Sequence, residues 1–475
     1  MMRLINCGQW RIETFHDKIP EYAILSHTWQ YDGKGNPEDV TYHDLKAYIE
    51  LNARKKQDPP DQDGWNKVKK ARDMAWKELD IMYIWIDSCC INQQDTSELT
   101  TSINSMYRWY AQSAVCIAYL SDQDRTDIGP CRWFNRGWTL QELIAPSQVL
   151  FYNKDWKYCG SRNGFKLKEK QDATYDLSKR IAKISSIDEE LLSKNDSRQI
   201  TRFLSSVPAC QKMSWASERE TTKPEDMAYC LTGIFDINHM HLKSGEGRRA
   251  FIRLQEEIIK QSGDLTLFAW LATKPEKCNP ENLLKSTDIE HNNSLFKFDQ
   301  HLHGIFACHP REFELGGSVK PAQPIMYNDE VIVTSKGVKF TASLEGSQPC
   351  SPFTMPLHCY NDISSRPLLG MELRWVGGDV YARSNIGSLK YLDVKKIQPS
   401  QDHVYVTHKI HHLQNHIRDL HQNSIHIPKK IGYPGCEMER TEVSPGYLWS
   451  EKHELLMTSG TRFPVAVSTF QRHLY

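Results

Sequence analysis

Three short clusters of polar and aromatic residues in the first part of the chain carry side chains that could do chemistry. They lie at residues 25–29, 85–93 and 136–143. Carboxyl, hydroxyl, imidazole and thiol groups of this kind act as catalytic acids, bases, nucleophiles or ligand-binding groups. The candidates are two acids, a serine, a histidine and two indoles, namely Glu142, Asp87, Ser26, His27, Trp29 and Trp138.

The first two clusters each follow a short apolar run. Residues 22–26 and 82–86 are apolar on both faces, which is typical of strands inside a parallel sheet covered by helices. Ligands of open α/β sheets bind outside the carboxyl ends of such strands. We therefore expect Ser26, His27 and Asp87 to converge at one edge of the sheet, provided that the two strands are neighbours.

The first 160 residues alternate strand and helix signals. After the first strand, and again after the second, apolar residues recur at the spacing of a helix. Asp95 to Glu98 has the pattern of a capping box. The alternation predicts an α/β fold with a parallel sheet flanked by helices and right-handed crossovers. The expected strands are 22–26, 82–86, 115–120 and 149–152, and the expected helices are 41–51, 65–79 and 95–114.

The remainder of the chain changes character twice. Residues 161–273 read as mainly helical, with a second capping box at 222–225. From 274 to 475, β-branched residues alternate with turn residues, and a hairpin is expected from residue 330 to residue 340. We predict three domains: an α/β domain at 1–160, a helical segment at 161–273 and a β-rich domain at 274–475.

The composition excludes several classes of protein. The 475 residues include 59 Lys and Arg against 59 Asp and Glu, so the balanced charge favours neither nucleic acid nor an acidic membrane. No run approaches the roughly 18 apolar residues that span a bilayer, and the first residues do not resemble a signal peptide. The 13 cysteines contain no CxxC pair, which argues against a zinc site. They are scattered along the chain, so we expect reduced thiols and a cytoplasmic location.

The three clusters resemble the three motifs of the fungal heterokaryon incompatibility (HET) domain. They read YAILSHTW at 22–29, WIDSCCINQ at 85–93 and GWTLQE at 137–142, and the resemblance covers roughly residues 20–160. A block between 213 and 257 is similar to the helical segment that often follows HET domains. The resemblance implies a cell-death effector of fungal non-self recognition that self-associates and is activated by an unknown protein partner.

HET domains in turn resemble, distantly, Toll/interleukin-1 receptor (TIR) domains. This implies a TIR/flavodoxin-like sheet of four or five parallel strands. In the enzymatic members of that group, a glutamate placed like Glu142 cleaves NAD, so the resemblance implies NAD glycohydrolysis with NAD as a substrate and no separate cofactor or metal. Asp87, Ser26 and His27 would then bind ribose or pyrophosphate, and Trp29 or Trp138 would stack on a base.

Other interpretations of the same residues remain open. Thr139-x-x-Glu142 is also a capping box, which would make Glu142 a purely structural residue. Asp87 can cap a turn with its own backbone. The domain can also be a non-enzymatic adaptor that signals through homotypic contacts. A hydrolase built on Ser26 and His27 is disfavoured, because adjacent residues of a strand point to opposite faces.

Overall fold

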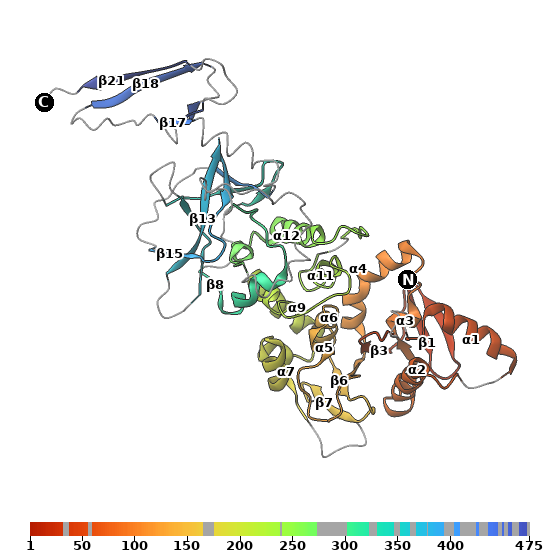
Figure 1. Cartoon of the computed structure of the whole chain (residues 1–475). Coiled ribbons are helices and arrows are strands. Elements are labelled where there is room, and N and C mark those ends of the chain that lie inside the picture. Colours follow the sequence, from red (N-terminus) through yellow and green to blue (C-terminus); the bar gives the residue numbers. More distant parts are fainter. Residues whose placement is uncertain are drawn as a thin grey trace, which may run out of the picture. The chain divides into compact units, whose positions relative to one another are not determined.

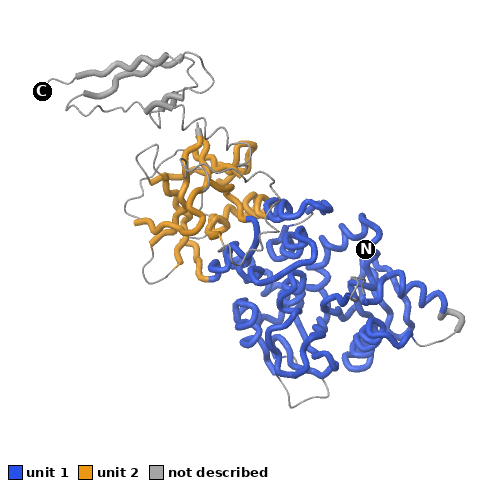
Figure 2. The backbone as a smooth tube through the Cα atoms, viewed as in Figure 1, with its two compact units in different colours: residues 1–254, 308–317 blue, residues 255–307, 318–475 orange. Residues whose placement is uncertain are grey.

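The chain divides into two compact units (Figure 2). Unit 1 comprises residues 1–254 and 308–317, and unit 2 comprises residues 255–307 and 318–475. The computed structural model describes residues 1–31, 38–55, 59–164, 175–237, 240–272, 302–322, 330–345, 352–361, 367–377, 379–393 and 403–408, together with strands at 424–426, 436–444, 449–450, 455–457 and 465–472.

Unit 1 is built on a seven-stranded sheet with the order β2-β1-β4-β3-β5-β6-β7, in the red to yellow part of Figure 1. The central strands β4, β3, β5 and β6 are parallel, which confirms the predicted α/β fold with its parallel sheet. The strands are β1 (Met2–Asn6), β2 (Arg11–Phe15), β3 (Tyr22–His27), β4 (Tyr83–Trp85), β5 (Val115–Tyr119), β6 (Val149–Tyr152) and β7 (Tyr158–Arg162).

Three antiparallel strands extend the parallel sheet beyond what the sequence predicted. β1 pairs antiparallel with both β2 and β4, and β7 pairs antiparallel with β6. No residue of β2 is fully buried, so it lacks the continuous apolar run by which the central strands were recognised. Edge strands of this kind need no apolar run on both faces.

The order of the parallel strands fixes where a ligand would bind. The chain moves from β3 to β4 on one side, and then crosses back to β5 on the other side of β3. This reversal is the topological switch point of a doubly wound sheet, and ligands bind at the carboxyl ends of the strands there. Ser26 is the register partner of Ala118 at this position.

Helices cover the sheet and follow the predicted apolar faces. The predicted helix 65–79 is present as α2 continued by one π-helical segment, η1. The predicted N-cap of the next helix is confirmed, because Asp95 accepts hydrogen bonds from the N–H groups of Ser97 and Glu98. The helices of this part are α1 (Tyr42–Lys55), α2 (Asp63–Asp73), η1 (Met74–Glu78), α3 (Asp87–Cys90), α4 (Thr96–Gln112), α5 (Arg132–Asn135) and α6 (Thr139–Ile144).

The segment after β7 is helical, as predicted. The expected capping box at 222–225 is wrong, because α11 begins at Asp226 and the Glu225 carboxyl instead accepts a hydrogen bond from the Gly245 N–H at 3.0 Å. The elements are α7 (Ser178–Ser185), α8 (Glu189–Leu192), α9 (Ser197–Ser206), α10 (Ala209–Ser214), α11 (Asp226–Tyr229), α12 (Arg249–Ser262), η2 (Leu265–Phe268) and η6 (Pro310–Ser318).

Unit 2 is rich in β-structure, which confirms the predicted β-rich C-terminal part. Its larger sheet has the order β11-β13-β14-β16-β10-β9, with β15 on β13, and the predicted hairpin is the antiparallel pair β9 and β10. The strands are β8 (Lys320–Pro321), β9 (Ile332–Val333), β10 (Val338–Thr341), β11 (Phe353–Pro356), β12 (Cys359–Tyr360), β13 (Leu368–Gly377), β14 (Val380–Arg383), β15 (Lys390–Leu392), β16 (His403–Val406), β17 (Ser424–His426), β18 (Cys436–Ser444), β19 (Trp449–Ser450), β20 (Leu455–Met457) and β21 (Val465–Arg472).

Candidate functional site

The carboxyl of Glu142 lies against the end of β3. The Ser26 hydroxyl donates a hydrogen bond to Glu142 Oε2, and the Trp133 indole N–H donates to the same hydroxyl at 2.8 Å. Ser26 is fully buried and Glu142 is 5% exposed. The three side chains come from β3, α5 and α6, so the predicted serine and glutamate meet at the switch point of the sheet.

The local capping box that competed for Glu142 does not form. Residue Trp138 occupies the N-cap position of α6 without a side-chain cap. The Thr139 hydroxyl instead donates to the carbonyl oxygens of Trp133 and Arg136, the second at 2.9 Å. Every residue of α6 is buried, so the short helix directs Glu142 inward rather than back to its own N-terminus.

Burial makes the Glu142 carboxyl hard to ionise. It raises the pKa of Glu142 to about 8, and the negative charge of Asp87 adds to this shift. Hydrogen bonds with Ser26 and Tyr110 oppose the shift but do not overcome it. Since a buried charge is disfavoured unless it is paired, the raised pKa favours the protonated form of Glu142 at neutral pH.

A second cluster forms around His27 on the other face of β3. His27 Nε2 lies 2.9 Å from Asp87 Oδ1, and the Trp29 indole N–H donates to Asp87 Oδ2 at 2.7 Å. The Asp87 carboxyl also accepts from the Ser88 N–H at 2.7 Å. The hydrogen bonds and the charge of His27 hold the pKa of Asp87 below its ordinary value, although desolvation works against them.

Two buried charges that the sequence analysis missed complete this second cluster. Asp39 Oδ1 lies 3.8 Å from His27 Nδ1 and forms an ion pair with Lys67 of α2. Asp39 and Lys67 are each 4% exposed. Lys67 stands among the buried residues Val68 and Ala71 of α2, and a lysine on the apolar face of a helix was the signal that could have revealed it.

The six predicted residues therefore fall into two clusters and one outlier. Ser26 and Glu142 lie on one face of the sheet, while His27 and its partner Asp87 face the α2 side with Trp29. Adjacent strand residues alternate between faces, so Ser26 and His27 have separate partners and form no dyad. The Trp138 indole N–H donates to Asp226 of α11 at 3.2 Å.

Two buried arginines hold the helix that carries Glu142. Arg219 Nη1 donates to the Arg136 carbonyl at 2.9 Å and to the Thr139 hydroxyl at 3.0 Å, at the start of α6. Arg162 Nη1 donates to the carbonyls of Leu143 and Ile144, at the end of α6. The bonds from Arg162 satisfy carbonyls at the C-terminal end of α6, where the last carbonyls of a helix have no partner within it.

Metal and thiol chemistry find little support in the described residues. No three His, Cys, Asp or Glu side chains among them are grouped so as to hold a metal ion. Cys89 and Cys90 are free thiols, and burial raises the pKa of both, which disfavours a nucleophilic thiolate. The spacing of the histidines at 408, 412 and 416 would place them on one face of a helix, where they could hold a metal ion, but the last two positions lie outside the described residues.

The geometry defines a doubly wound α/β domain with a buried carboxyl at its switch point. Residues 22–131 match the heterokaryon incompatibility protein (HET) family, so the chain carries a HET domain. Residues 249–336 match a domain of unknown function, DUF8212. No solved structure matches the chain. No helix in the described parts of the chain has the length and apolar character needed to cross a bilayer.

A curated relative supports the same family. The chain is 39% identical over 261 residues to the vegetative incompatibility protein HET-E-1 of Podospora anserina. The match covers 52% of this chain and 17% of the relative. The chain therefore shares with that protein a segment that makes up about a sixth of the relative's length.

Proposed function

We propose that this protein is a cytoplasmic cell-death effector of fungal non-self recognition. The HET domain at 22–131 and the similarity to a vegetative incompatibility protein support this role. Self-association and activation by a second protein belong to the same proposal, because related TIR enzymes are active when assembled.

The proposed activity of the HET domain is NAD glycohydrolysis with Glu142 as the catalytic carboxylate. The supporting observation is that the Glu142 carboxyl meets Ser26 at the switch point of a doubly wound sheet. When the bond from nicotinamide to ribose breaks, its electron pair goes to the cationic ring nitrogen and the nicotinamide leaves neutral. Water then attacks the ribose carbon and loses a proton.

The ribose acquires oxocarbenium character in this step, and a carboxylate beside it stabilises the charge. Since burial favours the protonated form of Glu142 and the acid is hydrogen-bonded to Ser26, the proposal requires that assembly open the pair and ionise the acid. His27, Asp87 and Trp29, joined by hydrogen bonds at the ends of β3 and β4, would hold the ribose or the pyrophosphate. For Trp138 a stacking role has weaker support, because its indole N–H is bound to Asp226.

A second candidate function is a non-enzymatic adaptor that works through homotypic contacts. The observation that favours it is the same burial, because a carboxyl that is 5% exposed and hydrogen-bonded internally has the environment of a structural residue. In this case Glu142 would fasten α6 to β3 and have no substrate.

Nicotinamide release from NAD separates the two candidates. The measurement uses the purified chain and the same chain fused to a tetramerising helix, each as wild type and as Glu142→Gln. The glutamine is neutral and isosteric with the protonated acid, so we expect the variant to fold normally and to release no nicotinamide. If the wild-type protein kills cells but releases none even when tetrameric, or if Glu142→Gln releases as much as wild type, the enzymatic proposal is wrong.

A further inference from the structure

The acid proton of Glu142 needs an acceptor of its own inside the domain. The Trp133 indole offers only an N–H, which donates to Ser26 Oγ at 2.8 Å. The Ser26 hydroxyl turns its own proton toward Glu142 Oε2, which is its other contact among the described residues. Since Oε2 already accepts this hydrogen bond, the proton of the neutral acid lies on Oε1 and points to a different partner.

The hydroxyl of Tyr110 in α4 is that partner. It forms a hydrogen bond with the Glu142 carboxyl and also donates to the Leu25 carbonyl at 3.2 Å. Tyr110 is 1% exposed, and its ring meets the Trp85 ring edge to face, with the centroids 5.9 Å apart and the planes at 79°. Because packing holds the ring in place, the hydroxyl changes partners by rotating its O–H bond alone.

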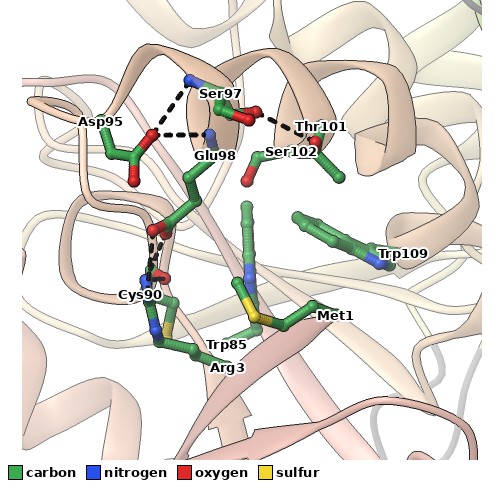
Figure 3. A pocket seen from close by; sticks show the side chains of 10 residues that line it. All are labelled: Met1, Arg3, Trp85, Cys90, Asp95, Ser97, Glu98, Thr101, Ser102 and Trp109. Atoms are coloured by element: carbon green, nitrogen blue, oxygen red, sulfur yellow. Dashed lines mark hydrogen bonds and ion pairs between the residues drawn. The ribbon is translucent and has the colours of Figure 1, made fainter.

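The pocket beside Trp85 does not reach this network. Trp85 and Trp109 line a pocket of about 330 Å³ near the first turns of α4 (Figure 3). Tyr110, Ser26 and Glu142 are not among its lining residues, and all three are buried. The hydrogen bonds around Glu142 therefore lie inside the protein, where each is stronger than it would be in water.

The two protonation states of Glu142 need opposite directions of the Tyr110 hydroxyl. In the neutral acid, Oε1 donates to Tyr110, which donates to the Leu25 carbonyl, so the chain of hydrogen bonds from Trp133 to Leu25 runs in one direction. When the acid loses its proton to solvent, the carboxylate can only accept. The Tyr110 O–H then turns from Leu25 to the carboxylate, because a hydrogen bond to a charged acceptor is about twice as strong as one between neutral groups.

We propose that Tyr110 is the positioning residue of Glu142, with a hydroxyl that accepts from the neutral acid and donates to the carboxylate. Together with Ser26 it would hold both oxygens of the ionised group and so fix the orientation of the carboxylate that the proposed NAD cleavage uses. This catalytic consequence rests on the proposed function, whereas the exchange of hydrogen bonds takes place with or without NAD.

Other groups around Glu142 also act on its ionisation. The charge of Asp87 opposes the loss of the proton, and the charge of Arg136 favours it. Arg219 and the Cys116 thiol also lie close enough to interact with a charge on Glu142. A substitution at Tyr110 keeps all four groups, so a comparison of tyrosine variants isolates the hydroxyl.

Infrared pH-difference spectra of the purified full chain test the proposal. The carbonyl stretch of protonated Glu142 is the band that wild type loses with rising pH and that Glu142→Gln lacks. Tyr110→Phe removes a donor to the carboxylate, so we expect the midpoint of this band to rise by about one pH unit. Tyr22→Phe is the matched control, because it removes a buried hydroxyl that donates to the Trp109 carbonyl at 2.6 Å and should leave the midpoint unchanged.

A second measurement needs no tyrosine variant. In wild-type protein with ring-labelled tyrosine, a tyrosine C–O band should shift together with the Glu142 carbonyl band, and Glu142→Gln should lack this shift. The proposal is overturned if wild type shows no carbonyl band that Glu142→Gln lacks, or if the midpoint in Tyr110→Phe equals that of wild type or of a shifted Tyr22→Phe. Where Tyr110→Phe does not fold, the absence of a coupled tyrosine band overturns it.

Nicotinamide release decides the proposed function separately, since both infrared bands are observed without NAD. If wild type releases nicotinamide, Tyr110→Phe should lower kcat about tenfold, the equivalent of one hydrogen bond, and leave KM close to wild type. If wild type releases none, the NAD proposal fails while the infrared midpoint still decides the role of Tyr110.

Discussion

The hydroxyl of Ser26 donates a hydrogen bond to the carboxyl of Glu142, which lies 116 positions further along the chain. This bond joins the end of β3 to α6 and holds inside the domain an acid whose pKa burial raises to about 8. A buried carboxyl with a raised pKa is a feature of many active sites, but structural networks produce it as well. The proton on Glu142 is measurable in either case.

The stability of the protein should fall as pH rises between about 4.5 and about 8, because of Glu142. In this window the folded protein holds a proton on the carboxyl that the unfolded chain releases. The unfolded state then binds fewer protons, so Glu142 lowers the free energy of unfolding by up to about 1.4 kcal/mol per pH unit. Urea denaturation across this pH range, for wild type and Glu142→Gln, measures the effect.

Because other groups titrate in both proteins, the informative quantity is the difference between the two pH profiles. The glutamine variant should lose the downward slope and become relatively more stable toward pH 8. Identical profiles would mean that Glu142 is ionised in the folded protein, and the argument for its protonation would be lost.

Breaking the ion pair between Lys67 and Asp39 on one side should strongly lower the free energy of unfolding. Lys67→Met leaves the Asp39 carboxylate buried beside His27 without its cation, and breaking a buried pair on one side costs about 3–5 kcal/mol. Adding Asp39→Asn removes the orphaned charge. We therefore expect the double variant to be more stable than Lys67→Met alone.

A double-mutant cycle of unfolding free energies gives the coupling between the two residues. Lys46→Met, on the exposed part of α1, is the matched control and should cost less than about 0.5 kcal/mol. Additive effects of Lys67→Met and Asp39→Asn would show that the pair contributes nothing as a pair.

The sequence was sufficient to locate strand ends but not to assign their side chains to partners. The apolar runs before Ser26 and Asp87 correctly placed both residues at the ends of adjacent parallel strands. For Glu142, the local sequence suggested a capping interaction with Thr139. Its actual partner, Ser26, lies too far away along the chain for a local pattern to reveal it. Which hydroxyl, indole or carbonyl ends up beside a side chain depends on strand order and helix packing.

The same reasoning explains the residues that were missed. Asp39 lies in a polar stretch with no periodicity, and it matters only because α2 brings Lys67 to it. Trp133 lies outside the three clusters and was not singled out, and its indole N–H reaches the Ser26 hydroxyl because α5 packs beside the end of β3. The edge strand β2 was missed because a strand without a fully buried residue carries a weaker pattern than a buried one. β1 is largely buried, but the sequence analysis did not single it out.

Gly233→Ala should destabilise unit 1. A Cβ at this position would lie 2.2 Å from Cβ of Tyr107 in α4, a distance at which one of the two segments has to move. Overpacking of this kind costs about 1–3 kcal/mol. At Gly129 a Cβ would meet no atom within 4 Å, so Gly129→Ala should stay within about 0.5 kcal/mol of wild type. Thermal unfolding of the two variants checks the contrast, and equal stabilities would contradict the close approach of α4.

Arg219 should hold α6, the helix that carries Glu142, in its folded position. Arg219→Met removes the guanidinium that donates to both the Arg136 carbonyl and the Thr139 hydroxyl, and these two groups keep only their bond to each other and the bond from Thr139 to the Trp133 carbonyl. We expect the loss to cost about 1–3 kcal/mol. The exposed Arg202 of α9 provides the control, since Arg202→Met should stay within about 0.5 kcal/mol of wild type.

Hydrogen exchange distinguishes a local role for Arg219 from a general loss of stability. If Arg219 anchors α6, the amides of residues 139–144 should exchange faster in Arg219→Met than a uniform drop in stability predicts, while the amides of β1 and β2 follow that drop. Uniformly faster exchange across unit 1 would show that Arg219 stabilises the domain as a whole and does not position Glu142.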